Sequence, residues 1–346
     1  MFTLSQASYD TKEILKWGGL FIGGLVVVIV FIQMFLIVKN AIFPTPPPKP
    51  TVAFGKLDPQ LFPASATSKK LTYKINTLTG YLPVFDNQIK VFKIKTFTAD
   101  LLSLQNAKDK AKMAGFTAEP TQLSNTNFEW DSIDPAGLNQ KIKMDIITNN
   151  FTLTSDFASN QTVLSKNLTN EKDSIKAATD FLAKINLLPV DIDTSKTKTS
   201  FFTIQNGITI PVTSLSDAKA IGIDFFQKNV NNMPIVYGQP NSSTLNFLVG
   251  SDGEIFQAQY FYQTPTSQSA TYPIKTSAQA YTDLQNGIAY VASYDGSSTT
   301  VSINNATLAY YMSSEAQNFL MPVIVFEGSD NFTAYVPAVT DGWINK

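Results

Sequence analysis

The chain has 346 residues and a formal net charge of -1, with 26 basic and 27 acidic side chains, and every basic residue is a lysine. This balance argues against a nucleic-acid partner, whose backbone attracts an excess of positive charge, and without arginine no guanidinium is present to bind phosphate in a bidentate manner. Cysteine and histidine are absent, which excludes disulfides, Cys-His and Ser-His nucleophile pairs, and thiolate or imidazole ligands for a metal. We therefore expect no metal site and no cofactor.

Residues 1–16 form a short polar head, which we expect to be cytoplasmic, and residues 17–38 form the first predicted element. The second segment reads WGGLFIGGLVVVIVFIQMFLIV, in which Gln33 is the only strongly polar side chain. A helix of this length, at about 1.5 Å per residue, covers the roughly 30 Å hydrocarbon core of a bilayer. The apolar run is longer than the about 7 to 15 residues of a secretory signal core, and no convincing cleavage site follows it. We therefore predict an uncleaved transmembrane helix and a lipid bilayer as its surroundings.

One face of this predicted helix combines small residues with a polar one. Gly19, Gly23, Val26, Val30 and Gln33 share it at three- and four-residue spacing. Glycines let two helix backbones approach closely, and an amide in lipid is stabilised by a partner amide. The face predicts a homodimer or a pairing with another membrane protein. The alternative is that the glycines are ordinary membrane-helix residues and that Gln33 bonds to its own backbone.

Residues 39–70 read as a proline-rich stalk and linker. Their segment 43–50, FPTPPPKP, favours an extended and semi-rigid polyproline conformation. Lysines lie on both sides of the predicted membrane helix, at Lys12, Lys16, Lys39, Lys49 and Lys56. Their balance does not decide the orientation. A long domain of low charge, rich in Ser, Thr and Asn, fits the outside of the cell, so we expect a single-pass protein of the plasma membrane whose large C-terminal domain is extracytoplasmic.

Residues 71–169 read as a first α+β subdomain. Alternating polar and apolar residues at 71–76 and 88–95 predict strands with one solvated face. Residues 98–114 predict a helix with Leu101 on its inner face and Gly115 as a left-handed cap. Two further strands, 141–147 and 150–153, flank a predicted hairpin turn at Asn149-Asn150.

Residues 170–346 read as a second α+β subdomain. Asn170 is a suitable N-cap for a helix that extends to residue 185, and Thr276 to Gln279 form a capping box for a shorter helix. Apolar and aromatic segments predict strands at 199–210, 221–227, 245–262, 300–311, 320–327 and 331–339. The predicted fold class is thus α+β: a single N-terminal transmembrane helix, followed by antiparallel sheets each packed by a helix.

The C-terminal part contains the most specific segments of the chain. They are YPIKT at 272–276, VSINNATLAYY at 301–311, LMPVIVF at 320–326 and FTAYVPAV at 332–339. They resemble the extracytoplasmic portions of the YycH/YycI regulatory membrane proteins and the related PepSY-type modules. The resemblance covers about a third of the chain and supports the fold more than an activity. It implies a PepSY/YycI-like fold, with the YycI-like part in the second subdomain, and a non-enzymatic partner of a membrane sensor kinase. The whole arrangement also resembles uncharacterised single-pass proteins of candidate-phylum bacteria.

No residue pattern identifies a catalytic centre. Asp252, Glu254, Glu327 and Asp330 lie in or beside predicted hairpins, where a carboxylate pair would suit glycoside hydrolysis. Turns collect acidic residues in any protein, however, and nothing in the sequence fixes the separation of these carboxylates. Serines and lysines are plentiful, but no motif selects a Ser/Lys pair. We therefore predict no catalytic residue.

Aromatic residues near predicted strand ends are the candidates for a binding surface. Tyr260, Tyr262, Tyr310 and Tyr311 are placed to line a groove for a peptide or an envelope polymer such as a glycan. Consecutive residues of a strand point to opposite faces, so at least one tyrosine of the pair 310–311 is expected in the core. The sequence predicts a non-catalytic binding, regulatory or scaffolding protein of the cell envelope. The alternative is a membrane-anchored envelope hydrolase that uses carboxylates or a Ser/Lys pair.

Overall fold

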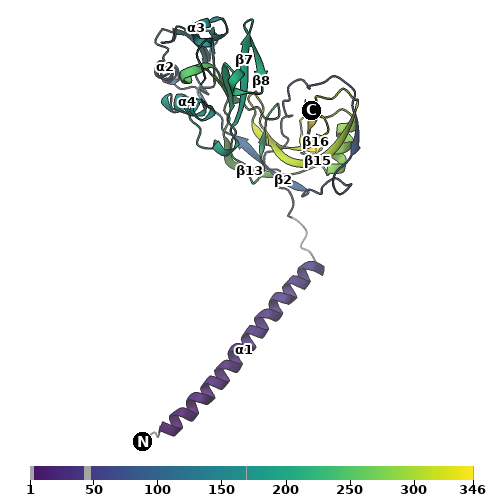
Figure 1. Cartoon of the computed structure of the whole chain (residues 1–346). Helices are drawn as coiled ribbons and strands as arrows, with labels where there is room; N and C mark the ends of the chain where they lie inside the picture. The colour runs from purple at the N-terminus through teal and green to yellow at the C-terminus, as the bar shows by residue number, and fades with distance from the viewer. Residues whose placement is uncertain (1–3, 43–47, 169, 346) are drawn as a thin grey trace. The chain divides into compact units, whose positions relative to one another are not determined.

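The computed structural model describes residues 4–42, 48–168 and 170–345. The chain forms two compact units, one up to Lys49 and one from Pro50 onward. The first unit consists of helix α1 (Leu4–Ile42) (Figure 1). The predicted stalk residues 43–47 lie outside the described part of the chain.

Helix α1 contains an apolar segment of 24 residues, Lys16–Lys39, whose most apolar 18-residue window has a mean hydropathy of 2.9. At about 1.5 Å per residue this segment is about 36 Å long, enough to cross a bilayer. Among the described residues it is the one helix with the length and composition for this. Large apolar side chains such as Trp17, Phe21 and Phe31 are exposed in the isolated helix, as expected of a segment surrounded by lipid.

The second unit contains a nine-stranded antiparallel sheet. Its spatial order is β3 (Thr121–Gln122), β4 (Asn127–Ile133), β5 (Asn139–Asp145), β6 (Phe151–Ser155), β12 (Ile255–Tyr260), β11 (Leu245–Val249), β9 (Ala220–Asp224), β7 (Lys198–Gln205) and β8 (Ile208–Val212). Helices α2 (Ser103–Ala114) and α4 (Glu171–Lys184) pack on one face through small and branched side chains, among them Ala107 and Leu182 (Figure 1). The short helix α3 (Gln161–Leu164) packs on a separate core cluster that contains Phe256.

An eight-stranded sheet forms the rest of this unit. Its main path is β1 (Thr72–Ile75), β15 (Thr300–Tyr311), β16 (Phe319–Gly328), β17 (Thr333–Pro337) and β14 (Tyr290–Ser293). β10 (Ile235–Val236) pairs with β15, and β2 (Gln88–Ile94) pairs with both β16 and β13 (Pro265–Pro273). β1 and β10 run parallel to β15, whereas the other pairings are antiparallel. Helix α5 (Ser277–Gln285) packs on this sheet through Ala280 and Leu284.

The fold class is α+β with mostly antiparallel sheets, as predicted, and several local signals are confirmed. Asn170 accepts a hydrogen bond from the Asp173 amide (2.9 Å) as the N-cap of α4. The capping box of α5 has both of its reciprocal hydrogen bonds. Gly115 ends α2 with a φ of 109°, a conformation that L side chains rarely adopt.

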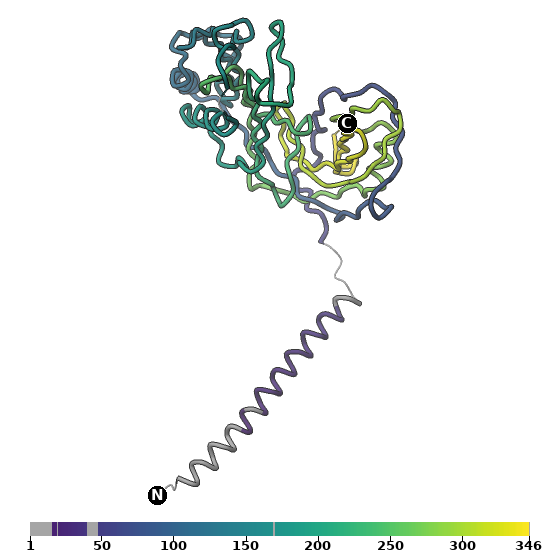
Figure 2. The backbone as a smooth tube through the Cα atoms, viewed as in Figure 1, coloured from purple at the N-terminus to yellow at the C-terminus, as the bar shows by residue number. Residues whose placement is uncertain are grey.

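The sheets do not follow the predicted subdomains 71–169 and 170–346. β1 pairs with β15 in the register Thr72↔Thr300, so an early strand completes a C-terminal sheet (Figure 2, dark blue beside yellow-green). β6 pairs with β12, which lies about a hundred residues further along the chain. The predicted linker 39–70 is also divided, because residues from Pro50 onward belong to the second unit. Leu57 in this segment is fully buried and forms a bridge with Ile344.

Two predicted elements have different limits. The helix predicted from residue 98 begins at Ser103, because the Asp100 side chain accepts hydrogen bonds from the Leu102 amide (2.8 Å) and the Ser103 hydroxyl (3.1 Å) and turns the chain there. Leu101 consequently precedes the helix and is fully exposed, so its predicted inward position is wrong. The strand predicted at 199–210 is a hairpin, β7–β8, because Asn206 and Gly207 both have positive φ.

Candidate functional site

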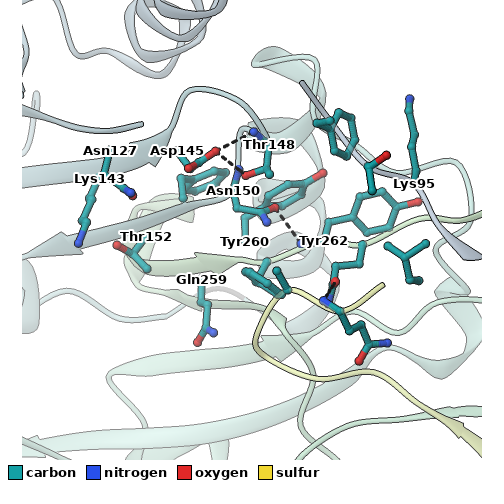
Figure 3. A pocket seen from close by; sticks show the side chains of 18 of the residues that line it. Lys95, Asn127, Lys143, Asp145, Thr148, Asn150, Thr152, Gln259, Tyr260 and Tyr262 are labelled. Atoms are coloured by element: carbon teal, nitrogen blue, oxygen red, sulfur yellow. Dashed lines mark hydrogen bonds between the residues drawn. The ribbon is translucent and has the colours of Figure 1, made fainter. Parts of the chain in front are cut away.

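A cavity of about 560 Å³ lies where the two sheets meet (Figure 3). Four segments line it: the end of β2 with the residues after it, the strands β4 to β6, the end of β12 with the residues after it, and the loop between β15 and β16. The lining residues are Ile94, Lys95, Thr96, Phe97, Asn127, Lys143, Asp145, Thr148, Asn150, Phe151, Thr152, Gln259, Tyr260, Phe261, Tyr262, Gln263, Ala316, Gln317 and Asn318. Both sheets therefore contribute to one concave surface.

The turn between β5 and β6 shapes one side of the cavity. Asp145 Oδ1 accepts hydrogen bonds from the Ile147 amide (3.0 Å), the Thr148 amide (2.8 Å) and the Thr148 hydroxyl (3.0 Å). Asn149 takes a left-handed conformation with a φ of 59°, which asparagine tolerates well. The Asp145 carboxylate is thus used to hold the turn, and it directs Asn150 towards the segment after β12 (Figure 3).

Asn150 and Tyr262 connect this turn to the segment that follows β12. The Asn150 side-chain oxygen accepts a hydrogen bond from the Tyr262 amide (3.0 Å). The Tyr262 hydroxyl donates to Asp191 (2.6 Å), while Gln227 donates to the other oxygen of the same carboxylate (2.9 Å). Burial and the contact with Asp191 raise the pKa of Tyr262. The phenol therefore remains a protonated donor, and the wall is held by satisfied hydrogen bonds.

Gln263, in the segment after β12, forms hydrogen bonds with the loop between β15 and β16. Its side-chain nitrogen donates to the carbonyl oxygens of Ser313 (3.2 Å) and Glu315 (3.1 Å), and its side-chain oxygen accepts from the Gln317 amide (2.9 Å). Gln263 is buried, so the loss of one partner would leave a desolvated polar group. This side chain therefore connects the segment that follows β12 of the nine-stranded sheet to a loop of the eight-stranded sheet.

Seven of the 19 lining residues are apolar or aromatic, and the other twelve are polar or charged, including two lysines. The Lys95 ammonium lies 4.9 Å from the centre of the Phe97 ring, and 41% of the surface of Phe97 is exposed. Among the residues that the structure describes, neither Lys95 nor Lys143 forms an ion pair. Asp145 is the one carboxylate of the lining. The site can therefore offer aromatic contacts, amides and positive charge to a ligand, but not two opposed carboxylates.

The predicted binding tyrosines separate into two pairs. Tyr260 and Tyr262 line the cavity. Tyr260 stacks on Phe151 with a centroid distance of 5.2 Å, and its hydroxyl donates to the Leu187 carbonyl oxygen (2.9 Å).

Tyr310 and Tyr311 are core residues with exposures of 0% and 1%, so they do not line a groove. The Tyr310 hydroxyl donates to the Lys90 carbonyl oxygen (2.7 Å), and Tyr311 packs on Phe62 at 4.6 Å. At least one member of this pair was expected to be buried. Both are, because β15 is covered on its two faces at this point.

The acidic residues singled out in the sequence are spread over both sheets. Glu327 and Asp330 lie at the end of β16, whereas Asp252 and Glu254 lie in the β11–β12 hairpin. None of them lines the cavity. In the described part of the chain, no group of three or more acidic side chains is arranged to hold a metal ion.

Glu254 has a partner that the sequence did not identify. Its carboxyl group hydrogen-bonds to that of Asp134, and burial together with this neighbour raises the pKa of Glu254 to about 8. Asp134 also accepts a hydrogen bond from the buried Gln140 side chain (3.2 Å). The Glu254 carboxyl group therefore keeps its proton at neutral pH.

The predicted helix-pairing residues all lie in α1. A side chain added at Gly23 would meet nothing within 4 Å, and Gln33 is exposed. The surroundings of Gly19 are outside the described part of the structure. Gly23 and Gln33 are thus accessible to a second helix or to lipid.

Several cavity residues were missed in the sequence. Phe97, Gln263 and Gln317 lie in loops without a periodic pattern, and no spacing connects them. Asn150 was recognised only as a turn residue. Comparison with protein-family models and with curated proteins gave no match for this chain.

Proposed function

We propose that this chain is a single-pass protein of the plasma membrane whose extracytoplasmic body binds a peptide or an envelope polymer without transforming it. The observation that carries this function is the cavity between the two sheets. Its volume of about 560 Å³ falls within the roughly 300 to 1,000 Å³ of ligand sites in proteins. Aromatic rings at Phe97 and Tyr262 suit the stacking of a sugar or an apolar side chain, and the amides beside them suit directional hydrogen bonds.

The chemistry of the lining favours binding over hydrolysis. Glycoside hydrolysis uses two carboxyl groups on opposite sides of the scissile bond. Asp145 is the one carboxylate in the lining, and one of its oxygens accepts three hydrogen bonds from its own turn. The Asp134–Glu254 pair lies outside the lining. The hydrolase alternative therefore gains no support from these residues.

A substitution that fills the cavity tests whether a ligand binds there. Thr152 lies on β6, is exposed and lines the cavity, whereas Thr154 is also exposed on the same face of the strand but lies outside this lining. We would place a photo-crosslinking amino acid at Gln259 in the full chain and irradiate native membranes. Thr152→Trp should abolish the adduct, and the matched Thr154→Trp variant should retain it. Equal adducts in both variants, or no adduct in the unblocked protein, would contradict the proposal.

The resemblance to YycH/YycI proteins adds a regulatory role to this proposal. In that role α1 would pair with a membrane partner through Gly19, Gly23 and Gln33, and the body would sense its ligand outside. A crosslinking pull-down should recover one discrete membrane protein, and this protein should be lost with the Gly19→Leu, Gln33→Leu double variant. The control moves each change by one position, to Gly18→Leu and Met34→Leu. Unchanged recovery in both double variants would restrict α1 to anchoring.

A further inference from the structure

The loop that joins β1 to β2, residues 76–87, presents three apolar side chains to the surroundings of the body. Leu78 is fully exposed, Val84 is 96% exposed and Tyr81 is 79% exposed. Single exposed apolar residues are common on protein surfaces, but three on one short loop form a local cluster. Such a cluster needs a physical explanation.

The loop is held in shape by its own contacts. The Gly80 amide donates to the Thr77 carbonyl oxygen (3.0 Å), and the Thr77 hydroxyl donates to the Tyr81 carbonyl oxygen (2.8 Å). Leu82 and Phe85 point the other way and pack against the core of the eight-stranded sheet. These partly buried contacts hold the loop, so Leu78, Tyr81 and Val84 remain on its outer side.

The strand register places the end of this loop close to the point where the chain enters the body. Thr51 and Val52 hydrogen-bond to Thr271 of β13. Thr271 pairs with Lys90 of β2, and β2 begins directly after the loop. Adjacent strands are about 4.8 Å apart, and Lys90 lies two residues after the start of β2. The C-terminal end of the loop, where β2 begins, therefore lies within about 20 Å of Thr51.

The tether between the membrane helix and the body is short. Eight residues separate Ile42, the end of α1, from Thr51. Any such segment spans at most about 30 Å. Thr51, where the chain enters the body, therefore lies within that reach of the end of α1.

The charge near the loop suits a lipid surface. Residues 69–90 contain four lysines, Lys69, Lys70, Lys74 and Lys90, against one acidic residue, Asp86. The whole chain, by contrast, has a net charge of -1. Apolar side chains with a tyrosine, surrounded by lysines, are the composition that partitions into the headgroup region of bilayers containing anionic lipids.

We propose that loop 76–87 is a second membrane contact, which inserts Leu78, Tyr81 and Val84 into the headgroup region of the bilayer that anchors α1. This contact is independent of the cavity and of the ligand proposed for it. It would restrict the rotation of the body on its tether and hold one side of the eight-stranded sheet against the membrane.

The absence of cysteine from the chain permits a direct test with one environment-sensitive fluorophore. Leu78→Cys and the control Leu101→Cys, two fully exposed leucines in loops, would each be labelled in the full chain. The protein would be reconstituted in vesicles of phosphatidylethanolamine and phosphatidylglycerol. Lipids that carry a spin label on the acyl chain should quench the label at position 78 at least about twofold more than the label at position 101. Iodide in the water should show the opposite order.

A second set of variants tests whether the contact with lipid depends on the apolar side chains of the loop. With the label at position 78, Tyr81→Glu and Val84→Glu together should remove the quenching by lipid. Val190→Glu, at an exposed position elsewhere on the body, should leave it unchanged. Equal quenching by lipid at positions 78 and 101 would overturn the proposal. Quenching at position 78 that survives both glutamates would overturn it as well, because the lipid contact would then not depend on Tyr81 and Val84.

Discussion

The carboxyl pair of Asp134 and Glu254 makes the stability of the body depend on pH. Glu254 follows the tight turn Ser251–Gly253 and leads into β12. Burial first, and then the hydrogen bond with Asp134, raise the pKa of Glu254 from 4.5 to about 8. Asp252 adds to this rise, and the ammonium group of Lys166 opposes it.

The sign of the effect follows from proton binding. Between pH 4.5 and about 8 the folded protein keeps a proton on Glu254 that the unfolded chain releases. The contribution of this proton to stability is complete below pH 4.5, decreases as the pH rises and is lost above about pH 8. The difference between the two pKa values corresponds to at most about 5 kcal/mol. Because Glu254 is partly exposed, solvent screening reduces this to roughly 1 to 2 kcal/mol.

Substitution of Glu254 by glutamine isolates this contribution. The amide is neutral at every pH and can still donate a hydrogen bond to Asp134. Glu254→Gln should match the parent protein below pH 5 and exceed it by roughly 1 to 2 kcal/mol at pH 9, which is about 2 to 4 °C in the melting midpoint for a body of this size.

Thermal unfolding of the full chain in detergent, followed by circular dichroism from pH 4 to 9, measures this difference. Glu327→Gln is the matched control, because Glu327 is an exposed glutamate of the other sheet that accepts a hydrogen bond from Asn305 (3.0 Å). A constant offset between Glu254→Gln and the parent protein at all pH values would refute the raised pKa of Glu254.

Three further changes test the packing and the caps. Gly250→Ala would place a methyl group 1.9 Å from the Phe256 ring and should lower the free energy of unfolding by about 1 to 3 kcal/mol, whereas Gly342→Ala meets open space and should not. Thr276→Ala removes the capping box of α5 and should cost about 1 kcal/mol, measured as faster hydrogen exchange in that helix. Tyr310→Phe removes the partly buried hydrogen bond to the Lys90 carbonyl oxygen and should cost about 1 kcal/mol in chemical denaturation. A change in midpoint with Gly342→Ala as large as with Gly250→Ala would contradict the packing argument, and unchanged exchange or denaturation would contradict the other two.

Local signals in the sequence were sufficient for two helix caps and one tight turn. The Asn170 cap, the Thr276 capping box and the Asn149-Asn150 turn depend on residues within a few positions of one another, so the sequence contains all that determines them. The polar strand β13 could not be found in this way. Its sequence, PTSQSATYP, lacks alternation, and it extends because β2 offers it a hydrogen-bonding edge.

Pairing between distant strands could not be predicted from alternation alone. The sequence indicates which face of a strand is apolar, but it does not indicate which neighbour covers that face. Tyr311 illustrates this limit. Its place at a strand end suggested exposure, and it is buried by Phe62, a residue of the segment that was expected to be a linker.

The cavity depends on the same distant pairings, which explains why only two of its aromatic residues were identified. Tyr262 acquires its position from Asn150 and Asp191, and Gln263 acquires its position from Ser313 and Gln317. Each of these side chains is polar and at least partly buried, so each must keep its partners for the fold to remain stable. The hydrogen bonds that join the two sheets therefore also hold the cavity open, and a ligand that enters it meets a surface already shaped before binding.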